Sequence, residues 1–302
     1  MAREDHTANP RKEIRIFLWL VIAFYTYNLP NARVVYNFLV ETIGQELTSK
    51  IPLLMVITTG LVYLAILLIS RRSLKNLLFL IPCGVIAYII ITLEPNPNKH
   101  IHIPEYVLMA WLLFAALSTD YKRGDLLLLI FILTSMLGVV DEIEQGIHPA
   151  RFYGWSDMLI NSASALIGVL TIMGLTDFKN PDFSWMRFFR RNHLTLWGIG
   201  LGILSAIAMG YFLFEVQKAE KFTGIYPGWL QVVGGVFMAL AFLIAIRLVK
   251  PGVSQIQNQK NSPPIFLHEK KIARLWVLPM LAILTYMHAM VFYLAISGTE
   301  FL

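Results

Sequence analysis

Long apolar runs dominate the chain, and short polar segments that hold most of the charges separate them. Nine of these runs approach the length of about 20 residues that an α-helix needs to cross the hydrocarbon core of a bilayer. They lie at about 14–30, 51–70, 77–93, 103–118, 126–145, 157–175, 194–214, 228–249 and 275–296. This pattern predicts an all-α, polytopic transmembrane helical bundle with about nine spans.

The composition supports this fold class. Hydrophobic residues make up 57% of the 302 residues and charged residues 15%, whereas soluble domains carry about 25% charged residues. Helices that are apolar on all sides need lipid as part of their solvent. The single cysteine, Cys83, lies inside an apolar run and cannot form an intrachain disulfide.

The distribution of the basic residues predicts the orientation of the chain. One set of alternating segments between the nine runs holds 19 of the 25 lysines and arginines, and the other set holds six. By the positive-inside rule, we expect a cytoplasmic N-terminus and an extracytoplasmic C-terminus. The net charge of +6 is then a consequence of topology, and we expect no nucleic-acid partner.

Three regions follow from the spacing of the runs. We predict a six-span domain at 1–175, a basic and aromatic cytoplasmic linker at 176–193, and a three-span region at 194–302 that could contact a membrane-protein partner. Segment 33–47 is too polar for a span. Val34, Val35 and Phe38 share one helical face, which indicates a helix in the outer interface, and a plain extracytoplasmic loop is the alternative.

Three consecutive spans are short of apolar residues at the same end. Their uncharged stretches are 13, 15 and 18 residues long, at 106–118, 126–140 and 159–176, which corresponds to roughly 20 to 27 Å of a core of about 30 Å. Glu105, Asp141 and Glu142 should therefore lie below the outer hydrocarbon boundary. Because a carboxylate that faces lipid at the bilayer centre costs about 2.5–3.5 kcal/mol, we expect these groups to face a hydrated depression open to the outside.

The spacing of further polar residues agrees with such a depression. His102 and Glu105 are three residues apart, and Asp141 and Gln145, like Asp157 and Asn161, are four apart. Arg151, in the loop between two of these spans, is the expected counter-ion of the carboxylates and a fork for an anionic oxygen. The predicted ligand-binding residues are His102, Glu105, Tyr106, Asp141, Glu142, Gln145, Arg151, Asp157 and Asn161.

Two motifs in this region resemble a known family. The run Lys99-His-Ile-His-Ile-Pro-Glu-Tyr106 resembles the K-x-x-H-x-x-E-Y element of VanZ-like membrane proteins. The run from Asp141 to Arg151, with Asp157 and Asn161 after it, resembles the D-E-I-x-Q…P-x-R…D…N element of that family. The match covers about 70 residues of the segment at about 14–175, and residues 176–302 match nothing in that pattern.

The resemblance implies a compartment and a context. VanZ-like proteins belong to the bacterial inner (plasma) membrane, and the founding member is linked to low-level resistance to teicoplanin. The family's biochemical activity is not settled, so the resemblance implies no particular reaction. We expect a multi-pass protein of the bacterial cell envelope.

Several functions are compatible with the cluster. We favour a cavity that binds the head group of an amphiphile, such as a lipid, a lipid-linked glycan or a lipoglycopeptide, and no cofactor is expected. The first alternative is an enzyme in which Asp141 and Glu142 act as acid and base at different proton affinities, and the second is a structural ion-pair network. A metal site is not expected, because His100, His102 and His148 lack the spacing of common zinc motifs. A transport pathway is disfavoured, because the inner halves of two spans, 103–118 and 126–145, carry no polar groups.

Overall fold

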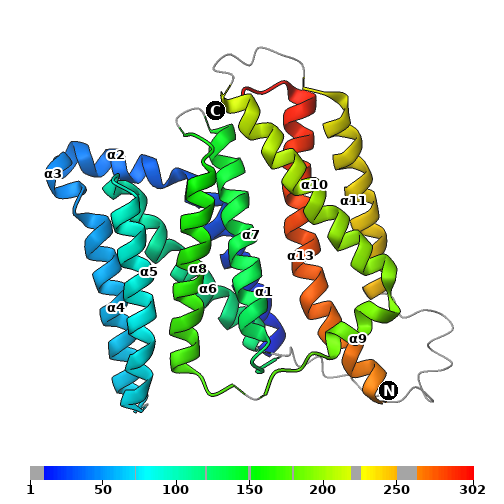
Figure 1. Ribbon diagram of the computed structural model, residues 1–302, viewed down its shortest axis with the longest axis horizontal. Helices are drawn as coiled ribbons and strands as arrows, with labels where there is room; N and C mark the ends of the chain where they lie inside the picture. The colour runs from blue at the N-terminus through cyan, green and yellow to red at the C-terminus, as the bar shows by residue number, and fades with distance from the viewer. Residues whose placement is uncertain are drawn as a thin grey trace, which may run out of the picture. The chain divides into compact units, whose positions relative to one another are not determined.

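The computed structural model describes residues 10–71, 73–119, 121–148, 151–178, 180–218, 226–249 and 264–302. All regular structure in these ranges is helical, and they contain no β-strand (Figure 1). The predicted all-α fold is confirmed. Pro149, which is part of the resemblance to the VanZ-like pattern, lies outside the described residues.

Eight helices among the described residues are long and apolar enough to cross a membrane. They are Gln45–Ile69, Lys75–Leu93, Pro97–Ser118, Leu126–Ile147, Trp155–Leu175, His193–Lys218, Gly228–Val249 and His268–Ser297. These helices coincide with the second to the ninth predicted runs, and the protein is a multi-pass membrane protein.

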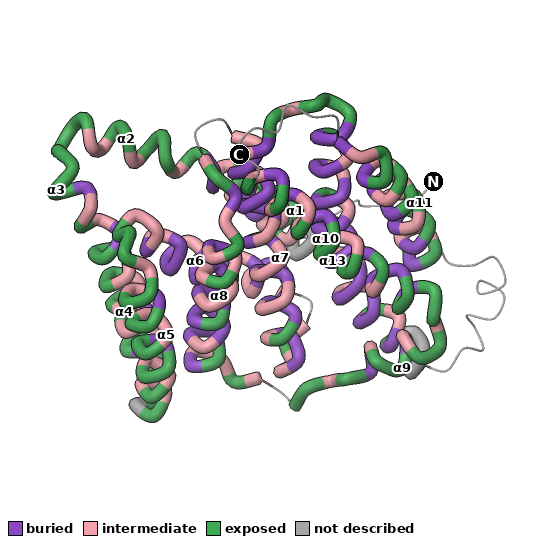
Figure 2. The backbone as a smooth tube through the Cα atoms, turned by 45° about the horizontal axis from the view of Figure 1, so that its top comes forward, coloured by how far each residue is buried: buried purple, intermediate pink, exposed green. Residues whose placement is uncertain are grey.

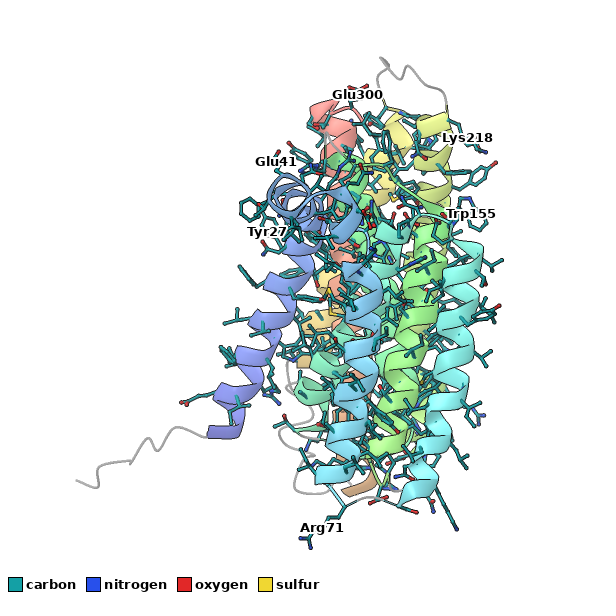
Figure 3. All side chains as sticks on the ribbon, turned by 90° about the vertical axis from the view of Figure 1, so that its left-hand side faces the viewer. Tyr27, Glu41, Arg71, Trp155, Lys218 and Glu300 are labelled. Atoms are coloured by element: carbon teal, nitrogen blue, oxygen red, sulfur yellow. The ribbon has the colours of Figure 1, made fainter. Side chains whose placement is uncertain are left out.

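The first predicted span forms a helix that is not one of the eight. Helix α1 (Pro10–Asn28) has charged residues in its first turns, so its uncharged part, Ile16–Asn28, is 13 residues long, or roughly 20 Å. Figure 3 shows that α1 runs from the end of the first compact unit that holds Tyr27 and Glu41 toward the end that holds Arg71. A ninth crossing, and with it the opposite placement of the two termini, stays a prediction.

The chain divides into two compact units. Unit 1 contains Met1–Ser135 and Leu159–Pro181, and unit 2 contains Met136–Met158 and Asp182–Leu302. The division falls within α7 (Leu126–Ile147) and α8 (Trp155–Leu175), whereas the sequence suggested a linker at 176–193. The domain assignment made from the sequence stays a prediction.

Unit 1 is built on α4 (Ile51–Ile69), α5 (Leu80–Leu93) and α6 (His102–Ser118), with η2 (Leu74–Phe79) and η3 (Pro97–Ile101) before the last two. An apolar core connects α5 and α6 to the unit 1 part of α8; it contains Cys83, Ile90, Ile103, Val107 and Ile167. Helices α6 and α8 approach closely at Gly168, where an added Cβ would lie 3.2 Å from the Cα of Val107. Large side chains could not be accommodated there.

Between α1 and α4, η1 (Leu29–Asn31), α2 (Ala32–Ile43) and α3 (Gln45–Thr48) form a helical segment. No residue of α2 is buried, and Val34, Val35 and Phe38 are exposed (Figure 2). The predicted helix is confirmed and the alternative of a plain loop is wrong. The position of α2 in the membrane interface stays a prediction.

Unit 2 is built on α9 (Ser184–Arg191), α10 (His193–Lys218), α11 (Gly228–Val249) and α13 (Pro264–Ser297). The last three contact one another (Figure 1). Glycines allow these helices to approach closely. A Cβ added at Gly202 would overlap the ring of Phe237, and a Cβ added at Gly234 would lie 3.3 Å from the carbonyl oxygen of His288. Residues 136–158, which belong to unit 2, carry most of the predicted site.

Candidate functional site

The two units divide the predicted site residues between them. Unit 1 holds four of them: His102, Glu105, Tyr106 and Asn161. Unit 2 holds the other five: Asp141, Glu142, Gln145, Arg151 and Asp157. The proximity of residues is described within each unit, and a single depression shared by both groups stays a prediction.

The unit 1 group is centred on the first turn of α6. His102 Nδ1 lies 3.2 Å from Glu105 Oε2, as the spacing of three residues predicts. The Tyr25 hydroxyl of α1 donates to the carbonyl oxygen of Glu105 at 3.1 Å. His102, Tyr106 and Asn161 are buried. These polar groups are therefore turned into the protein.

In the preceding η3, His100 and Lys99 both contact Glu94. His100 Nε2 lies 2.9 Å from the carbonyl oxygen of Glu94, and Lys99 Nζ lies 3.5 Å from its carboxylate. These contacts fix the turn between α5 and α6, so His100 and Lys99 have a local structural role.

The unit 2 group is organised by the side-chain amide of Gln145. Its Nε2 donates to Asp141 Oδ2 at 3.0 Å and to Glu142 Oε1 at 3.2 Å. All three side chains lie within the last turns of α7, and none is more than 2% exposed. Because both amide N–H groups are used in this way, the amide oxygen Oε1 is directed away from the carboxylates.

Arg151 is held by that amide oxygen. Its Nε donates to Gln145 Oε1 at 3.1 Å, and its side chain is partly exposed. Arg151 is thus connected to the carboxylates through Gln145, and its predicted role as their counter-ion stays a prediction. Within the described part of unit 2, the two Nη groups of Arg151 make no hydrogen bond or ion pair.

The second oxygen of Glu142 contacts the start of the α8 segment. Glu142 Oε2 accepts from the backbone N–H of Gly154 at 3.0 Å. A Cβ added at Gly154 would lie 3.0 Å from Asp157 Oδ2 and 3.6 Å from Glu142 Oε2. A glycine at this position leaves room for two carboxylates side by side, and an oxygen of each lies within 4.8 Å of the other.

Two such oxygens could contribute to a cation site. Ca²⁺ takes about six to eight oxygen ligands, so the pair Glu142 and Asp157 would be a minority of the coordination shell. The same oxygens can accept hydrogen bonds from hydroxyl or amine groups.

Sequence reasoning missed the residues that hold the loop of Arg151. Leu302 donates its N–H to the carbonyl oxygen of Gly146 at 2.8 Å, and Tyr153 donates its N–H to the carbonyl oxygen of Leu302 at 2.9 Å. Phe301 is buried, its ring centroid lies 5.2 Å from that of Tyr153, and an added Cβ at Gly146 would overlap it. The segment near Leu302 therefore fixes both sides of the loop.

The side chain of Tyr153 adds a third attachment. Its hydroxyl donates to the carbonyl oxygen of Gly210 in α10 at 3.2 Å. Burial, and to a lesser degree the charge of Glu142, raises the pKa of Tyr153, so this hydroxyl remains a neutral donor across the physiological pH range.

Glu144 is a further residue that the prediction did not include. It accepts a hydrogen bond from the Tyr286 hydroxyl of α13 at 2.6 Å. This contact ties the end of α7 to α13 on a face that does not carry Gln145. The position of Glu144, two residues after Glu142, gave no signal for this role.

Two exposed aromatic residues follow Arg151 in the sequence. Phe152 is 66% and Trp155 is 57% exposed, and Figure 3 places Trp155 toward the same end of unit 2 as Lys218 and Glu300. Aromatic side chains of this kind concentrate where hydrocarbon meets head groups. Trp155, four residues after Arg151, is therefore suited to that boundary.

Comparison of the chain with protein-family models, with curated proteins and with solved structures gives no match.

Proposed function

We propose that this membrane protein binds the anionic head group of an amphiphile at the cluster around Gln145 and Arg151. The observation that carries the proposal is the arrangement of Arg151, whose Nε is oriented by Gln145 while neither Nη group bonds to any described residue of unit 2. A planar guanidinium with two adjacent N–H groups matches the geometry of phosphate and carboxylate oxygens.

The surroundings of Arg151 favour an amphiphile over a soluble anion. Phe152 and Trp155 offer apolar contact for the upper part of an acyl chain. The carboxylates Asp141, Glu142 and Asp157 repel a second anionic group and accept hydrogen bonds from hydroxyls or amines. A head group with one anionic group and several donors, such as a lipid-linked glycan, meets both requirements.

The cellular context of the proposal comes from the resemblance to VanZ-like proteins. It supports a place in the bacterial inner membrane, a role in the cell envelope and a link to teicoplanin-type resistance. The three-span region 194–302 would then be free to contact a membrane-protein partner, which co-purification in mild detergent would reveal.

The test uses the purified full chain and a short-chain phosphatidic acid, with the matching diacylglycerol as uncharged probe. Because a hydrogen bond to a charged group contributes about 1.5–3 kcal/mol, Arg151→Gln should weaken phosphatidic acid binding roughly 10- to 100-fold. The affinity of Arg151→Lys for phosphatidic acid should fall between those of wild type and Arg151→Gln, because lysine keeps the charge but lacks the planar pair of N–H donors. Lys218→Gln, at an exposed lysine of the same unit, should bind like the wild type. Equal binding by wild type and Arg151→Gln would sink the proposal.

A membrane-embedded enzyme acting on a lipid-linked envelope precursor is the second candidate. The observation that favours it is the sharing of one amide by Asp141 and Glu142, since two close buried carboxylates separate in proton affinity and can act as acid and base. Turnover of a polyprenyl-phosphate-linked glycan that disappears in Glu142→Gln, with binding retained, would support it. Unchanged turnover in that variant would exclude it.

A further inference from the structure

The short helix α9 of unit 2 has one face fixed to the protein and one face exposed. Phe188 is buried, and the Trp185 ring stacks on that of Trp276 in α13 with centroids 4.3 Å apart. The exposed face carries Met186, Arg187, Arg190 and Arg191. Aromatic side chains hold one face of α9 against the protein, and the three arginines therefore lie together on the exposed face.

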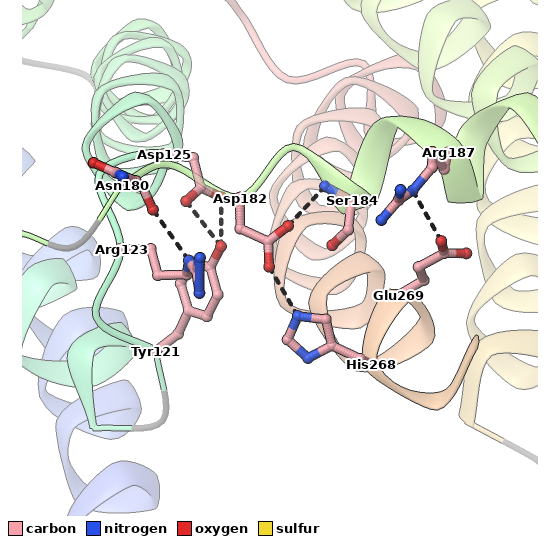
Figure 4. A network of polar contacts seen from close by, with 9 residues as sticks. All are labelled: Tyr121, Arg123, Asp125, Asn180, Asp182, Ser184, Arg187, His268 and Glu269. Atoms are coloured by element: carbon pink, nitrogen blue, oxygen red, sulfur yellow. Dashed lines mark hydrogen bonds and ion pairs between the residues drawn. The ribbon is translucent and has the colours of Figure 1, made fainter. Parts of the chain in front are cut away.

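These arginines are not equivalent. Glu269 of α13, which is 2% exposed, accepts from Arg187 Nε at 3.0 Å and from Arg191 Nη1 at 3.2 Å (Figure 4 draws the first pair). Arg187 and Arg191 are themselves 59% and 60% exposed. Arg190 is exposed and, among the described residues, has no hydrogen-bond or ion-pair partner for its side chain. The carboxylate of Glu269 thus pairs with two of the three guanidinium groups.

The position of α9 along the chain indicates its level relative to the hydrocarbon boundary of the membrane. The apolar helix α10 begins at His193, directly after α9, and Glu269 lies in the first turn of the apolar stretch His268–Ser297. Trp197, one turn into α10, is 67% exposed, as expected for a residue at the hydrocarbon boundary. The exposed face of α9 is therefore at head-group level.

The geometry points to a second lipid site, and we propose that α9 binds anionic phospholipid with Arg190 as the principal contact. The exposed Phe183 and Met186 provide apolar contact next to the arginines. A basic side chain near an anionic membrane surface contributes about 1 kcal/mol. Because Glu269 already neutralises part of the charge of Arg187 and Arg191, most of the attraction for a phosphate falls to Arg190. This site uses none of the residues around Gln145, so it is independent of the proposed head-group site.

The experiment is a titration of phosphatidylglycerol, and of phosphatidylcholine as its zwitterionic counterpart, onto the detergent-solubilised full chain, followed by native mass spectrometry. The Arg151→Gln background removes the contribution of the other proposed site. In that background, Arg190→Gln should weaken phosphatidylglycerol binding about fivefold and leave phosphatidylcholine binding and the melting temperature unchanged. Raising the ammonium acetate concentration should reduce the difference between the two lipids.

Two further variants distinguish a specific lipid site at Arg190 from a general effect of positive charge on lipid binding. Arg187→Gln should weaken phosphatidylglycerol binding less than Arg190→Gln does but lower the melting temperature, since it breaks a contact with Glu269. Arg247→Gln, at an exposed arginine near the end of α11, should behave like its parent. Parental phosphatidylglycerol binding by Arg190→Gln, or an equal loss in Arg247→Gln, would overturn the proposal. Neither result bears on Arg151, whose test uses a different probe and variant.

Discussion

Unit 2 contains arginines held in two different ways. At the end of α7, Arg151 is held through an amide, which is in turn hydrogen-bonded to two buried carboxylates. At α9, Arg187 and Arg191 contact the buried carboxylate of Glu269 directly. Both arrangements place an arginine near a buried carboxylate, but only at α9 do the arginines contact the carboxylate directly.

A buried carboxylate can thus neutralise an arginine directly, as at Glu269, or orient it through an amide, as at Arg151. A direct pair uses the guanidinium's donors and its charge, so it serves mainly to dock α9 on α13. An intervening amide fixes the direction of Arg151 through Nε and does not use its terminal donors. A buried carboxylate near an arginine is therefore not by itself a sign of a structural salt bridge.

The largest effect should come from removing the amide. Gln145→Leu leaves Asp141 and Glu142 buried without the donor that they share, and such losses cost roughly 3 kcal/mol or more. We expect a lower melting temperature in detergent and loss of phosphatidic acid binding by the proposed head-group site.

The matched control is Gln231→Leu. Gln231 of α11 donates a single bond to the carbonyl oxygen of Ala295 at 2.9 Å, and its loss should cost about 1 kcal/mol. If the two leucine variants were equally stable, the buried carboxylates would not depend on the amide and the comparison would fail.

Part of this arrangement could be predicted from the sequence. The helical spacing of Asp141, Glu142 and Gln145 placed them on one face of a helix. The shortage of apolar residues in that span predicted that its carboxylates face a hydrated depression, whereas the structure buries all three side chains. The contact between Gln145 and Arg151 could not be predicted, because sequence spacing brings Arg151 near the carboxylates but does not reveal that the amide turns its oxygen outward.

Other features depend on residues far apart in the chain. Gly146 and Phe301 meet only after α13 and α7 have packed, and nothing in the local pattern of either segment indicates the contact. The eight spans after α1 followed from apolar length alone, since each is uncharged over most of its course. For α1, four charged residues at its start shorten the uncharged stretch, so apolar length alone does not identify it as a span.

A smaller effect should follow from changing the direct pair. Glu269→Gln keeps the shape of the side chain and removes its charge, and because Arg187 and Arg191 are more than half exposed, water replaces part of the lost contact. We expect a destabilisation of about 1–2 kcal/mol, measured by thermal unfolding, and greater mobility of α9 in hydrogen exchange.

Glu215→Gln provides the exposed reference. Glu215 and Lys218 form a surface pair at 3.4 Å with both side chains about half exposed, and its loss should change stability by well under about 1 kcal/mol. A loss in Glu269→Gln no greater than in Glu215→Gln would remove the distinction between the buried and the exposed acid.

The smallest effect concerns a third pair, next to α9. His268 Nε2 lies 2.8 Å from Asp182 Oδ2, and Asp182 also accepts from the Ser184 N–H at 3.0 Å (Figure 4). Burial opposes ionisation of this carboxyl, but the hydrogen bonds from His268 and Ser184 outweigh it and lower the pKa of Asp182.

A lowered pKa in the folded state fixes the sign of the pH effect. Asp182 stabilises the fold above its usual pKa of 3.8, and this contribution is lost as the pH falls below that value through the folded pKa. The melting temperature of wild type should therefore exceed that of Asp182→Asn at pH 6 and approach it near pH 3. A constant difference over this range would contradict the assignment.

The attachment of the Arg151 loop to the segment near Leu302 has a consequence for biogenesis. Gly146 and Tyr153 leave the ribosome well before Phe301 and Leu302, the residues that hold them. Translation must pass through three further apolar helices, α10, α11 and α13, before the loop can be immobilised. A nascent chain halted after α8 would therefore carry every polar residue of the cluster but would lack the contacts that hold the Arg151 loop in place.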